Sequence, residues 1–195
     1  LGTEHPAKKP SRAAAVDKTL VYMGSFMPYK NVDLLVRSME KLPGYRLQLM
    51  SRISDAERER LTDLAPAGSV EFVNGASDEQ YEAAMRNATA LVSASRDEGF
   101  GLPPVEAMAL GTPVLLSDIP IFREIGGEPA GYFDPDSTDS FVAAVRELED
   151  PQEWKRRSAA SVTWAQRYNW PDAAKQLLAV LQEAVELRAS NRARR

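Results

Sequence analysis

The chain has 195 residues, of which 44% are hydrophobic and 27% charged, proportions typical of one soluble globular domain. It contains no cysteine, which excludes disulfides, thiolate catalysis and zinc–thiolate sites. Its single histidine, His5, lies in a segment that we interpret as a linker, so we expect no His-centred triad from this chain alone. The net charge of −4 argues against a nucleic-acid partner, and no apolar run is long enough to predict a membrane span. The lack of cysteine fits a cytoplasmic protein.

Residues 1–18 carry Gly2, Pro6, Pro10 and several charges before any periodic pattern begins, which indicates a linker or hinge. Short apolar runs follow, and most of them lack the alternation of a half-exposed strand. These runs are Leu20–Gly24, Arg46–Met50, Ser69–Val73, Ala88–Ser93, Pro113–Ser117 and Gly131–Phe133. The segments between them have helical periodicity, namely Asn31–Lys41, Ser54–Leu64, Asp78–Asn87 and Pro103–Leu110. This order predicts an α/β fold with a doubly wound, Rossmann-like parallel sheet and right-handed crossovers.

After Asp136 the pattern is helical, with helices expected over Ser137–Leu148, Pro151–Tyr168 and Trp170–Ala189. We expect one domain over residues 19–189 and a basic tail over residues 190–195.

Ligands of doubly wound sheets bind beyond the carboxyl ends of the strands. The loop after the first run extends from Gly24 to Asn31, where Asn31 could cap the next helix. Lys30 stands just before that helix, where a cation opposes the helix dipole. It either points into water or binds an anion together with the helix end, and the loop alone does not decide between them.

A second loop runs from Ser95 to the helix that Pro103 and Pro104 begin. Gly99 and Gly101 would let the backbone approach a ligand and expose its amides to phosphate. Glu98 precedes this turn, and Glu106 follows in what we take as the first helical turn. Carboxylates accept hydrogen bonds from sugar hydroxyls, so the two carboxylates around an amide-lined turn favour a nucleotide-sugar. The alternative is that Glu106 complements the helix dipole and Glu98 is a solvent-exposed charge.

The stretch Asp134-Pro135-Asp136 spells an Asp-x-Asp motif, which can hold a divalent metal. Because Ser137 and Thr138 and then a helix follow directly, a turn and a helix cap are favoured over a metal site.

These residues together resemble the C-terminal domain of family 4 retaining glycosyltransferases, which have the GT-B fold. The likeness covers about Leu20 to Glu186 and includes the E-x7-E signature, formed here by Glu98 and Glu106 within EGFGLPPVEAMA. Further matching stretches are GTPVLLSDIP, FVNGASDE and the Tyr168-Asn169-Trp170 start of the last helix.

The resemblance implies a role for each matching residue. Glu98 would contact the donor sugar, and Lys30 would neutralise the leaving diphosphate. Glu106 would hold the ribose, and the backbone near Ala76 would meet the base. The residues implied to border the sugar and diphosphate are Gly24, Ser25, Gly99, Phe100, Gly101 and Leu102. The family typically needs no metal or other cofactor, and its donors are UDP- or GDP-sugars.

One departure concerns Ser25, which stands where the family often has an arginine that shares the diphosphate; Arg52, after the second run, is a candidate replacement. The family's acceptor-binding N-terminal domain has no counterpart in this sequence. Membrane association through that domain, at the inner face, is left open, and the isolated domain is expected to bind nucleotide without transferring sugar. The face of the last helix that carries Leu177, Leu181 and Val185 is therefore expected to be partly exposed.

Three functions remain open at this point. The first is transfer of a hexosyl group to an unknown acceptor, with retention at the anomeric carbon. The second is a non-catalytic nucleotide-sugar-binding module. The third is another GT-B enzyme, such as a sugar-nucleotide epimerase or a phosphorylase, the latter with a lysine-bound pyridoxal cofactor.

Overall fold

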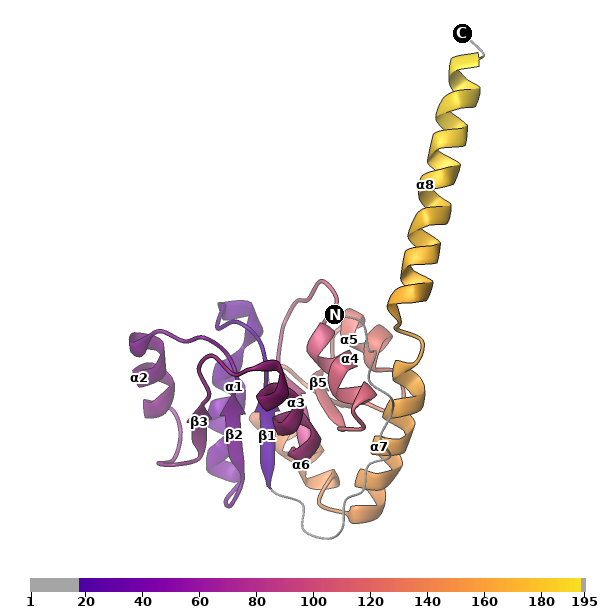
Figure 1. The fold of residues 1–195 in the computed structure, drawn as a ribbon. Coiled ribbons are helices and arrows are strands. Elements are labelled where there is room, and N and C mark those ends of the chain that lie inside the picture. The colour runs from indigo at the N-terminus through magenta and orange to yellow at the C-terminus, as the bar shows by residue number, and fades with distance from the viewer. Residues whose placement is uncertain (1–17, 194–195) are drawn as a thin grey trace. The chain divides into compact units, whose positions relative to one another are not determined.

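The computed structural model describes residues 18–193 (Figure 1). They fall into two units, one that extends to Ala165 and one that begins at Gln166. The linker predicted over residues 1–18 lies, apart from Lys18, outside the described residues, and so do Arg194 and Arg195 of the predicted tail.

The larger unit is built on one parallel sheet of six strands in the order β3-β2-β1-β4-β5-β6. The strands are β1 (Thr19–Tyr22), β2 (Arg46–Leu49), β3 (Val70–Phe72), β4 (Ala90–Ser93), β5 (Val114–Ser117) and β6 (Gly131–Phe133). This is the order of the Rossmann fold, in which the winding direction reverses between β1 and β4. The predicted doubly wound α/β fold is confirmed.

The helices of this unit are α1 (Val32–Ser38), α2 (Asp55–Asp63), α3 (Asp78–Asn87), α4 (Leu102–Ala109), α5 (Pro120–Gly126), α6 (Thr138–Glu147) and α7 (Pro151–Ala165). Two short 3₁₀ helices, η1 (Pro28–Lys30) and η2 (Met39–Lys41), lie on either side of α1. The sequence analysis missed α5, whose seven residues are too few for a clear helical period, although Pro120 at its start and Gly127 after its end are the usual boundary residues.

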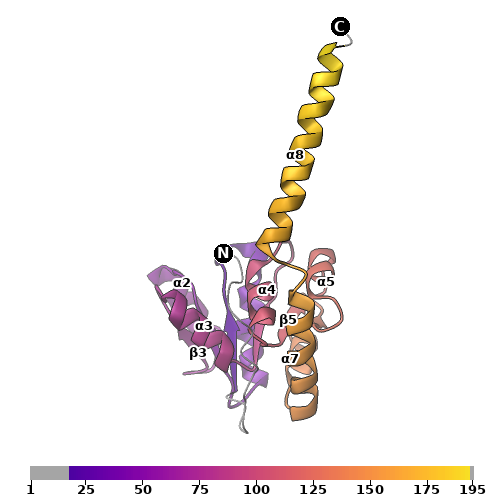
Figure 2. The same ribbon diagram turned by 45° about the vertical axis from the view of Figure 1, so that its right-hand side comes forward.

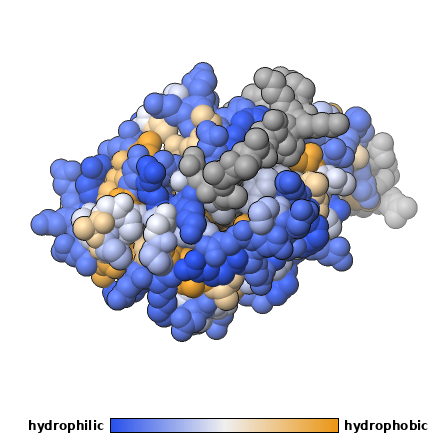
Figure 3. All heavy atoms as spheres, turned by 90° about the horizontal axis from the view of Figure 1, so that it is seen from below, coloured by the Kyte–Doolittle hydropathy of each residue, from blue (hydrophilic) through white to orange (hydrophobic). Residues whose placement is uncertain are grey.

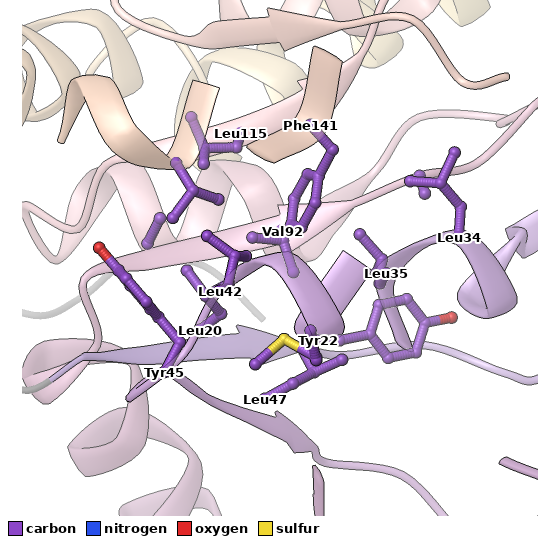
Figure 4. Close-up of a cluster of buried hydrophobic side chains, with 14 of the residues drawn as sticks. Leu20, Tyr22, Leu34, Leu35, Leu42, Tyr45, Leu47, Val92, Leu115 and Phe141 are labelled. Atoms are coloured by element: carbon purple, nitrogen blue, oxygen red, sulfur yellow. The ribbon is translucent and has the colours of Figure 1, made fainter. Parts of the chain in front are cut away.

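Alternate residues of β1 point to opposite faces of the sheet, and both faces are covered. Leu20 and Tyr22 belong to the main core, whereas Val21 packs with Met50, Ala88 and residues of α3. The main core joins the sheet to α1, α2 and α6 (Figure 4). The side chains labelled there are Leu20, Tyr22, Leu34, Leu35, Leu42, Tyr45, Leu47, Val92, Leu115 and Phe141.

Strands β4 and β5 are buried along their whole length. On the α3 side, α4 packs against α7, and Figure 2 shows the two helices next to each other. The Trp154 indole N–H of α7 donates to the Thr89 carbonyl at 2.8 Å, which fixes the start of α7 next to β4. Because both faces of the central strands are covered, a ligand can approach these strands only at their ends.

Figure 3 views the molecule from the side on which the N-terminal ends of the strands lie. Over the described residues visible in this view, hydrophilic side chains predominate and the apolar areas are small and separate. Large contiguous apolar patches mark binding surfaces more often than scattered apolar residues do.

The smaller unit contains α8 (Trp170–Ala193) (Figure 1). The Asn169 side chain accepts the Asp172 N–H at 2.9 Å and so caps its first turn. The expected exposure is confirmed, since Leu177, Leu181 and Val185 are 60%, 53% and 68% exposed. The helix continues beyond Ala189 because the following residues include no glycine or proline. None of the helices described over residues 18–193 has the length and apolar character that a membrane span requires.

Candidate functional site

The loops after β1 and β4 meet beyond the carboxyl ends of these two strands, at the point where the winding direction of the sheet reverses. They are joined directly, because the Arg96 N–H donates to the Tyr29 carbonyl at 2.8 Å. The region beyond the carboxyl ends of the strands, at the point where the winding direction reverses, is the usual ligand site of doubly wound sheets.

Lys30 and Glu98 form an ion pair between these two loops. Lys30 Nζ lies 2.5 Å from Glu98 Oε1, and the two side chains are only 15% and 14% exposed. The interpretation that either residue is a solvent-exposed loop charge is therefore wrong. Partial burial of two charges is costly unless further hydrogen bonds hold them, and Ser95 Oγ supplies one by donating to the same Glu98 oxygen at 2.8 Å.

The backbone next to Lys30 adopts an unusual conformation. Lys30 ends η1, and Asn31 has φ 53°, the one positive φ outside glycine among residues 18–193. Asn31 does precede α1, but its side chain does not cap the helix as predicted. Its amide instead donates to the Pro135 carbonyl at 2.8 Å, a contact that holds the left-handed turn and so fixes the direction of Lys30.

The Ser25 side chain is exposed, and its carbonyl accepts the Tyr22 hydroxyl at 2.5 Å. Burial, followed by the nearby Glu98 carboxylate, raises the pKa of Tyr22. Tyr22 therefore remains a protonated donor that holds the loop in place just after β1. A Cβ at Gly24 would come within 2.7 Å of this hydroxyl, which explains the glycine there.

Helix α4 begins directly after the glycine turn. Its N-cap residue Gly101 has φ 92°, and a Cβ there would come within 2.8 Å of Ile125 Cδ1, so glycine is required. Gly99, by contrast, has open space where a Cβ would stand. The expectation that both glycines serve a close backbone approach therefore has conformational support only at Gly101. Phe100 and Leu102 beside it are 41% and 48% exposed.

Glu106 lies beyond the first turn of α4, which contains no acidic residue, so the prediction of a first-turn position is wrong. An explanation by the helix dipole loses its basis there, because that effect fades within the first turn. The Glu106 carboxylate instead accepts the Tyr81 hydroxyl of α3 at 3.1 Å. Burial, and then Glu106 itself, raises the pKa of Tyr81, which keeps this donor protonated.

Arg52 and Ala76 lie in the loops that follow β2 and β3, beyond the carboxyl ends of these strands. Arg52 is exposed, and no hydrogen bond or ion pair connects it to the rest of the described chain. Ala76 is partly buried against the cluster of Val21, Met50 and Ala88. The structure thus pairs Lys30 with Glu98, whereas Arg52 forms no hydrogen bond or ion pair with either residue.

The Asp134-Pro135-Asp136 stretch forms the predicted turn. The Asp134 carboxylate accepts the Asp136 N–H at 2.8 Å, and Ser137 caps α6 by accepting the Ser140 N–H at 3.1 Å. Asp136 forms an ion pair with Arg96 at 2.6 Å. This pair ties the β6 loop to the loop that carries Glu98.

Two residues of the site, Ser95 and Tyr81, were missed by the sequence analysis. Each orients a carboxylate that the analysis had singled out, but nothing in the local sequence distinguishes them from other serines or tyrosines. Only the fold reveals the pairing of Tyr81 with Glu106.

Comparisons with known proteins identify the family of the chain. Residues 5–162 match the family described as "Glycosyl transferases group 1". The O-antigen chain mannosyltransferase RfbU of Salmonella typhimurium is 34% identical over 65% of this chain and 37% of its own length. The GDP-mannose:cellobiosyl-diphosphopolyprenol alpha-mannosyltransferase of Xanthomonas oryzae is 29% identical over 81% of this chain and 45% of its own.

A solved structure shows the same fold. Sucrose-phosphate synthase from Thermosynechococcus elongatus has a TM-score of 0.77 and 27% identity, over 89% of this chain and 47% of that one. The chain spans less than half the length of these proteins.

The strand order and the reversal of the winding direction between β1 and β4 define a domain of the Rossmann-like class. The chain belongs to the glycosyl transferases group 1 family and corresponds to the C-terminal half of a GT-B enzyme.

Proposed function

We propose that this domain binds the nucleotide-sugar donor of a retaining hexosyltransferase. The observation that carries the proposal is the Lys30–Glu98 pair, 2.5 Å between Nζ and Oε1, at the reversal point of the sheet and just before the start of α4. A cation and a carboxylate next to the positive end of a helix dipole can serve a diphosphate and a sugar at the same time.

In this proposal each residue has one task. Glu98 accepts hydrogen bonds from sugar hydroxyls, and Glu106, oriented by Tyr81, does the same for the ribose. The backbone from Gly99 to Leu102 faces the sugar and diphosphate, and Ala76 lies at the base. Gly24 and Ser25 border the diphosphate.

The acceptor would attack from the face that the diphosphate leaves, so the anomeric configuration is retained. Lys30 and the positive end of the α4 dipole stabilise the charge of the leaving diphosphate, which is electrostatic preorganisation. Glu98 positions the sugar without attacking it. The chemistry is completed by an acceptor-binding domain, which also determines the acceptor.

The names of the relatives favour one donor. One of them uses GDP-mannose, and the other is also a mannosyltransferase. We therefore propose GDP-mannose as the first donor to test, with UDP-sugars as the alternative.

A second candidate, a binding module without catalysis, is favoured by Ser25 and Arg52. Ser25 lacks the positive charge common there, and Arg52 is exposed without a bond to Lys30 or Glu98. Joining the chain to an acceptor domain of a mannosyltransferase relative distinguishes the two functions, because only the enzyme then transfers sugar.

Calorimetric titration with GDP and with UDP tests the proposed site. We expect one of the nucleotides to bind, and Glu106→Ala to weaken it by about tenfold or more, because a charge-assisted hydrogen bond to the ribose is lost. Tyr81→Phe should weaken it less, since the carboxylate remains. Glu59→Ala, an exposed carboxylate of α2, is the matched control and should bind like the native chain. Failure of both nucleotides to bind, or unchanged binding by Glu106→Ala, contradicts the proposal.

A further inference from the structure

Three serines lie at the carboxyl ends of β4 and β5, in an otherwise apolar part of the sheet. Ser93, Ser95 and Ser117 are 8%, 0% and 0% exposed. A buried hydroxyl costs free energy unless it is hydrogen-bonded. All three are bonded, and the bonds converge on Ser95 and through it on Glu98.

The direction of these hydrogen bonds follows from proton counting. The Ser95 hydroxyl has one proton, and it donates that proton to Glu98 Oε1 at 2.8 Å, because a carboxylate paired with lysine only accepts. In the 3.3 Å contact between Ser93 Oγ and Ser95 Oγ, Ser93 must therefore be the donor. The Ser117 hydroxyl donates to the Ser95 carbonyl. Ser95 is thus held at its side chain and its backbone, and the network is polarised toward Glu98.

The two oxygens of Glu98 have different environments. Oε1 receives both Lys30 Nζ and Ser95 Oγ. Among residues 18–193, no group forms a hydrogen bond with Oε2. One oxygen is thus occupied by the protein, and the other remains available to a ligand.

A diphosphate competes with Glu98 for Lys30. When the ammonium turns to the phosphates, Glu98 loses its closest partner and Oε1 retains only the Ser95 hydroxyl. A partly buried carboxylate that loses its counter-ion becomes free to rotate or to attract water. The hydrogen bond from Ser95 to Glu98 is the one that remains when Lys30 turns to the diphosphate.

We propose that Ser95 is a positioning residue that holds Glu98 through Oε1 and thereby directs Oε2 to a hydroxyl of the donor sugar. This inference rests on the proposed donor-binding function. It distinguishes the sugar from the nucleotide, because Ser95 acts only through Glu98 and should not affect a ligand that has no sugar.

Calorimetry first measures which pair of ligands binds to the native chain, GDP and GDP-mannose or UDP and UDP-glucose. The variants are then titrated with both ligands of that pair. Ser95→Ala should weaken the sugar nucleotide about tenfold, the typical effect of removing a hydrogen bond to a charged group. The nucleoside diphosphate should change by less than about twofold. In a Glu98→Ala background, Ser95→Ala should have no further effect, which a merely structural role would not predict.

Ser38→Ala is the matched control, since Ser38 is also fully buried and its hydroxyl bonds only to the Leu34 carbonyl of its own helix, at 2.7 Å. It should lose similar stability in thermal unfolding but keep both affinities. Ser95→Cys retains a weaker donor and should give a smaller loss, which serves as the test if Ser95→Ala does not fold.

The outcomes separate the two proposals. If Glu98→Ala lowers the affinity for the sugar nucleotide relative to the nucleoside diphosphate and Ser95→Ala binds like the native chain, the role of Ser95 is refuted and the donor site stands. If neither ligand pair binds to the native chain, the donor site itself is refuted.

Discussion

Replacing Glu98 with glutamine should make the domain bind a nucleoside diphosphate more tightly and a sugar nucleotide less selectively. The substitution removes the negative charge that lies 2.5 Å from Lys30 Nζ, so the ammonium no longer has to leave an ion pair before it meets the phosphates. We expect the diphosphate affinity to rise by about three- to tenfold. Glutamine cannot orient the sugar as the carboxylate does, so transfer by the chain joined to an acceptor domain should fall by about 100- to 1000-fold.

Asp97→Asn is the control for this experiment, because Asp97 is the exposed neighbour of Glu98 and its substitution changes the net charge equally. Both variants are compared with the native chain by calorimetry and by initial rates of transfer. If Asp97→Asn shows the same gain in diphosphate affinity, the effect reflects overall charge and the exchange of partners by Lys30 is refuted.

Replacing Gly127 with alanine should cause the largest loss of stability. Gly127 ends α5 with φ 55°, and a Cβ there would lie 2.0–2.4 Å from three ring carbons of Trp164. The ring is not free to move away, because its Nε1 donates to the Ile125 carbonyl at 2.8 Å. We expect a loss of about 3 kcal/mol or more, which corresponds to a fall in Tm of about 10 °C for a protein of this size.

Gly68→Ala measures the cost of a positive φ alone, without the clash with Trp164 that is expected at position 127. Gly68 also has a positive φ, 76°, but nothing lies within 4 Å of its added Cβ. It should lose only about 1–2 kcal/mol. Thermal unfolding followed by circular dichroism measures both variants, and equal losses would show that the packing of Trp164 on Gly127 contributes little.

The sheet was predictable because its strands are buried on both faces. Such strands appear as continuous apolar runs, and β4 and β5, covered along their whole length, are the clearest cases. Boundaries were less predictable. Ala88 and Thr89 look like strand residues, but the Ala88 N–H bonds to carbonyls of α3, so Ala88 caps that helix and β4 begins only at Ala90.

The candidate site was predictable only in part. The loops that carry Lys30 and Glu98 follow from the strand order, and the resemblance supplied their expected roles. Their ion pair could not be derived from the sequence, because each residue alone is compatible with an exposed loop charge. The pairing of Tyr81 with Glu106 and the left-handed Asn31 depend on tertiary contacts, which local sequence patterns do not encode.

The Lys30–Glu98 pair joins residues 68 positions apart in the sequence. An unfolded chain therefore has no trace of the site, and any donor that binds does so to the folded state alone. By mass action, a ligand at about 100 times its Kd then adds about 2.7 kcal/mol to the free energy of unfolding. A melting-temperature screen of nucleotide sugars would thus rank the candidate donors without an acceptor, a labelled substrate or any turnover.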